Sequence, residues 1–183
     1  MPIITPIIFW ELYREAMRAA LQMPGSWQAY QRDKTWTPIA VGVAKAVCQR
    51  SLGLETEKEY FRIDLIGFES KRAGDWHLRV AYEHENRDSW HTELCKLTHV
   101  VADLCVLSSY YDFHKDQPLE NALQVIINRL EDRIERVPAR QWLFIFGPRS
   151  ACAEKPFVAL GLNETRQVVV LPDGNPLFVR PRA

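Results

Sequence analysis

Acidic side chains meet at one end of a predicted β-hairpin, where they could hold a metal ion. The stretch 76–85 reads as a strand, so Glu83 and Glu85 should point to the same side, with Cα atoms about 6.5–7 Å apart. Asp64 lies in the preceding predicted strand, and a hairpin would bring its carboxylate beside both glutamates. Converging carboxylates repel one another unless a cation or a proton compensates them. Oxygen ligands of this kind suit Mg²⁺ or Mn²⁺, so the pattern predicts a three-carboxylate site for one of these ions.

Basic residues near these acids could assist the hydrolysis of a phosphate ester. An ion held by the acids could polarise a phosphate, make hydroxide from water and neutralise a leaving oxygen. Lys96 lies on the helix predicted after the second strand, where it would orient or activate water. Glu93 lies three residues earlier on the same side of that helix and could position Lys96 or add a ligand. Arg62 and Arg79 could contact the phosphates of a nucleic acid.

The same acids also have a plainer interpretation. Glu83 and Glu85 could be solvent-facing charges on a one-sided antiparallel sheet, and Asp64 could pair with Arg62 or Arg79. Ion-pair networks of this kind perturb carboxylates as functional sites do. The residue types alone therefore leave a metal site and a structural charge network both open.

Side-chain alternation assigns the two faces of the second strand. One face is expected to be apolar and the other polar. The apolar face should carry Leu78, Val80, Tyr82 and His84, and the polar face His77, Arg79, Ala81, Glu83 and Glu85. We therefore expect His84 to be a core histidine rather than a metal ligand.

The elements that must position these residues alternate between helices and strands. Thr5-Pro6 and Thr37-Pro38 are helix-start signals, which predict N-terminal helices within 5–53 and a connection over 26–36. We expect strands at 60–68, 76–85, 104–107, 142–146, 157–160 and 167–171, a turn at 69–75, and helices starting near Asp88 or Ser89 and at Gln117. This order predicts an α/β or α+β fold, with a mixed central sheet flanked by helices and a small C-terminal β extension. We expect one domain over 1–183, with the C-terminal helix and β extension over about 117–183.

Composition limits the function classes that remain. The 183 residues include 23 basic and 23 acidic side chains, and 47% are hydrophobic, as in an ordinary globular domain. Zero net charge excludes a whole-surface electrostatic grip on nucleic acid, although a local basic cleft remains possible. The four cysteines show no metal-type spacing, which indicates a reduced, cytoplasmic protein. The apolar N-terminus is too short to span a bilayer, so no membrane partner is expected.

The order of these motifs resembles a known nuclease group. Asp64, then Glu83-His84-Glu85 after a hairpin, then a helix and a buried strand, is similar to the PD-(D/E)xK nuclease superfamily, which has the restriction-endonuclease-like fold. More locally, bacterial members of that group are similar to the run Ala81-Tyr82-Glu83-His84-Glu85-Asn86, followed by Trp90, Glu93-Leu94 and Lys96-Leu97. The resemblance covers about residues 37–112.

The resemblance implies roles for particular residues of this chain. Asp64 and Glu83 would be metal ligands, and Glu85 occupies the position at which the family usually has lysine. Some members carry that lysine on a neighbouring helix, and Lys96 is the candidate here. The expected activity is phosphodiester hydrolysis of nucleic acid with Mg²⁺ or Mn²⁺, and a homodimer would suit cleavage of two strands. If Lys96 does not reach the site, the alternative is a non-catalytic module on the same fold that binds a protein partner.

Two other classes of site find no support. Ser108-Ser109 is not surrounded by a Gly-x-Ser-x-Gly elbow, which excludes a serine hydrolase of that type. The sequence has neither a Gly-x-x-x-x-Gly-Lys loop nor a Gly-x-Gly-x-x-Gly loop, so nucleotide-binding folds of those types are also excluded.

Overall fold

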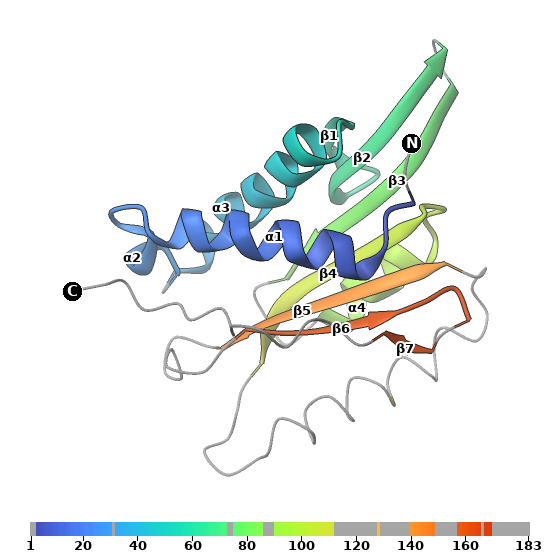
Figure 1. Cartoon of the computed structure of the whole chain (residues 1–183). Helices are drawn as coiled ribbons and strands as arrows, with labels where there is room; N and C mark the ends of the chain where they lie inside the picture. Colours follow the sequence, from blue (N-terminus) through green and yellow to red (C-terminus); the bar gives the residue numbers. More distant parts are fainter. Residues whose placement is uncertain are drawn as a thin grey trace.

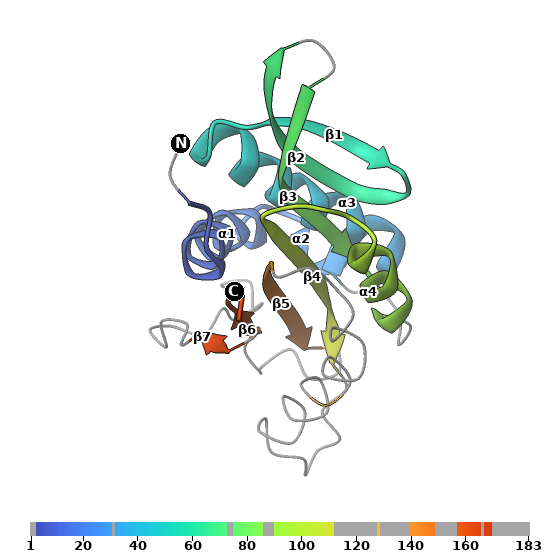
Figure 2. The same cartoon turned by 90° about the vertical axis from the view of Figure 1, so that its right-hand side faces the viewer.

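A mixed β-sheet with helices on both faces forms the centre of the chain (Figures 1 and 2). The computed structural model describes residues 3–30, 32–72, 75–85, 90–111, 128, 140–148, 157–165 and 167–169. Within these residues seven strands follow one another in chain order: β1 (Glu55–Tyr60), β2 (Ile63–Arg72), β3 (Asp75–His84), β4 (Leu104–Tyr111), β5 (Gln141–Pro148), β6 (Val158–Leu162) and β7 (Val168–Val169). The pairs β3–β4 and β4–β5 are parallel and the others antiparallel. The predicted α/β class with a mixed sheet is confirmed.

The first helix begins at the predicted signal. In α1 (Pro6–Leu21) the Thr5 hydroxyl accepts a hydrogen bond from the Ile8 N–H at 3.3 Å, and Pro6 occupies the first turn, where its missing N–H costs nothing. Phe9, Tyr13 and Met17 are buried on the side of α1 that faces the sheet, whereas Ile8 is exposed. The two large aromatic rings therefore decide which side of α1 faces the sheet.

The second predicted helix starts earlier than its signal. Residues 26–36 were expected to be a connection, but they contain α2 (Ser26–Tyr30) and the start of α3 (Asp33–Ala46), which continues as a π-helical turn over Val47–Ser51. Pro38 consequently lies inside α3 instead of opening it. Trp36 is buried edge-on against Tyr30, with ring centroids 4.8 Å apart, and this packing supports a helical path before the proline.

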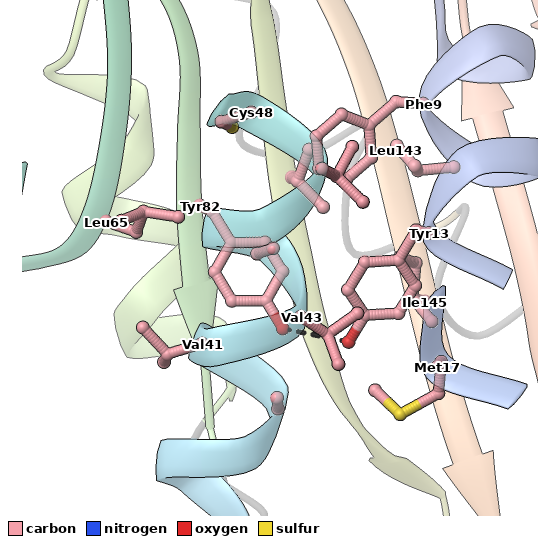
Figure 3. Packing of buried hydrophobic residues seen from close by; sticks show 14 of the residues in the cluster. Phe9, Tyr13, Met17, Val41, Val43, Cys48, Leu65, Tyr82, Leu143 and Ile145 are labelled. Carbon is pink, nitrogen blue, oxygen red and sulfur yellow. Dashed lines mark hydrogen bonds between the residues drawn. The ribbon is translucent and has the colours of Figure 1, made fainter. Parts of the chain in front are cut away.

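Two hydrophobic clusters pack on opposite faces of the sheet. Helices α1 and α3 cover one face, where the hydroxyls of Tyr13 and Tyr82 lie 3.1 Å apart among apolar side chains (Figure 3). Helix α4 (Trp90–Thr98) covers the other face with Leu94 and Leu97. The candidate site residues belong to the α4 side of the sheet, so this helix is the element that completes the site.

The hairpin that carries the acids has different strand boundaries and turns from those predicted. A single strand was predicted over 60–68, but β1 ends at Tyr60 and the chain turns at Phe61-Arg62, where φ is 48° and 65°. Positive φ at both central residues is the pattern of the type I′ hairpin turn, in which glycine or asparagine is usual. The predicted turn over 69–75 is also wrong, because β2 remains paired as far as Arg72. The long β2–β3 arm projects beyond the remaining strands (Figure 1).

A β-bulge in β3 changes which side chains share a face. Gly67 pairs with Val80 but Phe68 pairs with Leu78, so Arg79 is an extra residue on β3. As a result Leu78 packs against the α4-side cluster, while Val80 packs on the opposite face. The prediction that the Leu78 and Val80 side chains share a face is therefore wrong.

The remaining predicted elements lie partly inside and partly outside the described residues. The strands expected near 104–107, 142–146, 157–160 and 167–171 correspond to β4, β5, β6 and β7. The helix expected from Gln117 lies outside the described residues except for Asn128, which is helical. Among the described cysteines, Cys48, Cys95 and Cys105 are free thiols. No helix in the described part of the chain is both long and apolar enough to cross a membrane.

Candidate metal centre

Asp64 and Glu83 face each other on neighbouring strands. Leu65 pairs with Tyr82 in the antiparallel β2–β3 ladder, so one further step along the same register places Asp64 opposite Glu83. Directly opposite side chains in such a ladder lie on the same face, with Cβ atoms about 4.5–5.5 Å apart. The backbone N–H of His84 donates to Asp64 Oδ2 at 2.8 Å and holds that carboxylate in place. The hairpin therefore brings together two of the three predicted metal ligands.

Glu83 is the more buried of the two acids. It is 2% exposed, and its Oε1 atom accepts no hydrogen bond. Burial, and then the neighbouring charge of Asp64, raise the pKa of Glu83 to about 9. Burial likewise raises the pKa of Asp64, against the effect of the His84 N–H. Two acidic side chains thus share a small, poorly solvated space that disfavours their charged forms, and a cation bound there would favour ionisation of both.

Helix α4 adds a cation and a third acid to this pair. Its apolar residues Leu94 and Leu97 are fully buried against the sheet, and Glu93 and Lys96 each directly precede one of these leucines. The Lys96 ammonium lies 3.7 Å from Glu83 Oε1 and forms an ion pair with Glu93 one turn earlier. Lys96 therefore lies beside Glu83, and Glu93 lies beside Lys96.

Glu85 lies one residue beyond the end of β3 and continues the pairing with β4. Its N–H donates to the Ser108 carbonyl at 2.9 Å, and its own carbonyl accepts from the Ser109 hydroxyl at 2.9 Å. The side chain is half-buried. These main-chain hydrogen bonds anchor Glu85 beside Ser108 and Ser109 on β4, whereas Asp64, Lys96 and Glu93 are the charges that most affect the pKa of Glu83.

The two predicted phosphate-binding arginines occupy very different places. Arg79, the bulged residue, is buried and pairs with Glu69 at 2.5 Å and with Asp103 at 2.7 Å. Arg62 is exposed in the β1–β2 turn. Arg79 therefore already has two carboxylate partners, whereas the guanidinium of Arg62 faces solvent. Sequence reasoning missed both acidic partners of Arg79, because the bulge that aims this side chain leaves no local sequence signal.

The two carboxylates suit a hard divalent cation that binds only a few protein side chains. Within the described residues no three Asp, Glu, His or Cys side chains come close enough together to form a complete metal cage. Mg²⁺, however, keeps several waters and is usually bound through one or two carboxylates together with substrate phosphates. Asp64 and Glu83 supply two carboxylates, and Glu83 Oε1 has a vacant lone pair for such an ion. His84 is not a further ligand candidate, since its ring is buried against Tyr110 and its Nδ1 lies 3.2 Å from the Ser108 hydroxyl.

A pocket opens beside this centre. It has a volume of about 670 Å³ and is lined by Lys96 together with aromatic side chains of the hairpin, among them Phe61 and Trp76. The sequence did not assign these aromatic residues to the site, because Phe61 was placed within a strand. The exposed ring of Phe61 is recognised as part of the pocket lining only once the turn at this residue is known.

No model of a protein family matches the sequence, and no curated protein matches it significantly.

Proposed function

We propose that this protein is a metal-dependent nuclease that hydrolyses phosphodiester bonds of nucleic acid. The observation that carries the proposal is the convergence of Asp64 and Glu83 with Lys96 from the following helix, the buried Glu83 Oε1 being without a hydrogen bond. Acidic groups whose pKa values are raised by burial and by one another are typical of functional sites, which supports a functional role.

Each residue has a distinct part in the proposed reaction. Asp64 and Glu83 would hold Mg²⁺ or Mn²⁺, with Glu85 as the predicted third ligand; the bound ion supplies Lewis-acid polarisation of the phosphate and a more acidic water. The His84 N–H fixes the Asp64 carboxylate in its orientation. Lys96 would orient the attacking water and offset negative charge that develops on the phosphate. Glu93 is a positioning residue, because its ion pair holds the Lys96 ammonium at the carboxylate pair.

Calorimetric titration with Mn²⁺ tests the metal site directly. We expect the wild type to bind the ion, and Asp64→Asn and Glu83→Gln to lose most of the binding heat. The matched control is Glu57→Gln, which alters an exposed acid on β1. The titration is repeated with inorganic phosphate, because phosphate oxygens often complete such a site. A folded wild type that binds no Mn²⁺ in either titration contradicts the proposal.

A cleavage assay then separates binding from chemistry. Lys96→Met should retain Mn²⁺ binding but lose about 10²-fold or more in cleavage rate, as is typical when a group that stabilises developing charge is removed. Glu85→Gln distinguishes a two-carboxylate site from a three-carboxylate site, since only the latter loses Mn²⁺ affinity in this variant.

A second candidate is the non-catalytic interaction module on the same fold. The observation that favours it is the ion pairing of Lys96 with both Glu83 and Glu93, because a lysine can neutralise the acids without any metal. On this alternative Mn²⁺ binding is absent and Lys96→Met only destabilises the fold.

A further inference from the structure

The pocket beside Lys96 combines exposed aromatic rings with basic groups. Its described lining includes Tyr60, Phe61 and Trp76 from the hairpin, together with Lys96, His77 and His99. Lys96 is ion-paired with Glu83 and Glu93, and His77 Nε2 lies 3.1 Å from Asp103 Oδ1, but none of these acids lines the pocket. A volume of about 670 Å³ lies within the range of ordinary small-ligand sites. The lining thus suits a ligand with a flat apolar part and a negative charge.

The aromatic rings form a continuous, partly exposed surface. The ring of Tyr60 lies edge-on to Phe61 with centroids 4.6 Å apart, and 5.6 Å from Trp76, which in turn stacks on the buried Phe68 at 4.4 Å. Phe61 is 81% exposed and Trp76 is 40% exposed. Phe68 supports Trp76 from the core side, so the indole is held in place while part of it remains accessible.

The backbone holds Phe61 in an unfavourable conformation. Its φ of 48° lies in the left-handed region, and neighbouring Arg62 and Glu59 also have positive φ. Such a conformation costs a bulky residue about 1–3 kcal/mol and persists only where other interactions enforce it. A glycine would relieve this cost but would remove the ring, so a role for the ring explains the residue type better than the turn does.

We propose that Tyr60, Phe61 and Trp76 form a stacking platform for an unpaired nucleobase of a single-stranded nucleic acid. The inference rests on the proposed nuclease function for the identity of the ligand. Aromatic side chains stack on bases of any sequence, and basic groups beside them follow the phosphate backbone. Lys96 lines the pocket and also contacts Glu83, so a strand stacked here would have a phosphate close to the carboxylate pair. The substrate class is therefore a nucleic acid with an unpaired stretch at the cleavage position.

Fluorescence anisotropy with labelled oligonucleotides tests this platform in the full-length chain. The probes are a short oligothymidylate, an oligouridylate of equal length, and an abasic strand with the same number of phosphates, all in EDTA so that no metal-dependent cleavage occurs. We expect at least one of the base-containing strands to bind about 10-fold more tightly than the abasic strand, because stacking is worth about 1–3 kcal/mol per base. Equal affinity for the abasic strand, or no binding of any probe, overturns the proposal.

Variants of the two exposed rings test whether these rings cause the tighter binding of base-containing strands. Phe61→Gly and Trp76→Ala should each weaken binding of the preferred base-containing strand about five-fold or more, while Trp76→Phe should retain most of it. The control is Met23→Ala, which removes an exposed apolar side chain just beyond α1. Phe61→Gly relieves the positive-φ strain, so its melting temperature should not fall and its weaker binding cannot be attributed to unfolding.

Two further readouts distinguish a failure of the stacking platform from a failure of the metal site. Mn²⁺ titration of Phe61→Gly should match the wild type, so a failed platform with intact metal binding overturns the stacking proposal alone. Absent metal binding with base-dependent affinity overturns the nuclease proposal and leaves the platform standing. Concentration-dependent self-association that Phe61→Gly abolishes, without base-dependent affinity, would instead make the rings a contact between copies of the chain and overturn the platform.

Discussion

Lys96 Nζ lies 3.7 Å from Glu83 Oε1, and it is the cation placed to compensate this buried acid. The two residues come from different elements, and the lysine side chain remains about one-third exposed while that of the glutamate is nearly inaccessible. Because Lys96 lowers the pKa of Glu83 while Asp64 and Glu93 raise it, the lysine moderates an otherwise strongly unfavourable cluster. This asymmetry leads to the first prediction.

Removal of Lys96 should destabilise the fold mainly through Glu83. We expect Lys96→Met to lower the free energy of unfolding by about 1 kcal/mol, a modest value because the lysine is partly solvated. In the double variant Lys96→Met/Glu83→Gln the loss should be smaller than the sum of the single losses, since no buried acid then remains without its cation. Urea denaturation of the four proteins at about pH 9, near the pKa of Glu83 and therefore with much of this acid ionised, measures this coupling, and strictly additive effects would contradict it.

Stability should decrease with rising pH because of Glu83. Its pKa is about 9 in the folded protein, against an ordinary value of 4.5, so between these pH values the folded state binds a proton that the unfolded state has released. The free energy of unfolding must fall as pH rises through that window. Thermal melts in EDTA should show this decline in the wild type and a flatter profile in Glu83→Gln. The exposed-acid variant Glu57→Gln should follow the wild type; a wild-type profile as flat as that of Glu83→Gln would contradict the prediction.

Substitution of two glycines by alanine should have opposite effects. A Cβ on Gly147 would lie 2.5 Å from the Phe157 ring, so Gly147→Ala should lower the free energy of unfolding by about 1–3 kcal/mol. Apart from its chain neighbours and the backbone of its own helix, no atom lies within 4 Å of a Cβ on Gly42, which is inside α3, so Gly42→Ala should raise the free energy of unfolding by up to about 1 kcal/mol. Chemical denaturation of both variants measures the difference, and a stabilising shift in both would mean that the Phe157 ring moves aside at little cost.

A glycine in the β1–β2 turn should stabilise the hairpin. Arg62 is exposed and has a φ of 65°, so Arg62→Gly should raise the free energy of unfolding by about 1 kcal/mol. Lys58→Gly, in the paired part of β1, should lower it by about 0.5–1 kcal/mol, because glycine there only adds entropy to the unfolded chain. Urea midpoints of the two variants provide the test. Destabilisation by Arg62→Gly would mean that the arginine side chain contributes more than the backbone strain costs.

Local patterns in the sequence were sufficient for much of the fold. Thr5-Pro6 predicted the start of α1, because a hydroxyl cap and a proline act only on the adjacent turn. The side-chain alternation that separates Glu83 from Tyr82, and the three-residue spacing that puts Glu93 beside Lys96, are both present in the structure. Such features depend on the period of a strand or a helix, which the sequence carries within a few residues.

Long-range packing decided the remaining features. The positive φ of Phe61 and the bulge at Arg79 have no local signal, since neither residue type favours its conformation. The bulge places Leu78 on the α4 face of the sheet, and the turn exposes the Phe61 ring beside Lys96.

The sequence by itself determined which side chains carry charge, and how far apart they lie along each strand or helix. Only the tertiary structure decided that Asp64, Glu83 and Lys96 meet and that an aromatic pocket adjoins them. The physical reason is that strand register and helix docking depend on the burial of apolar surface from distant segments, which a local pattern does not encode.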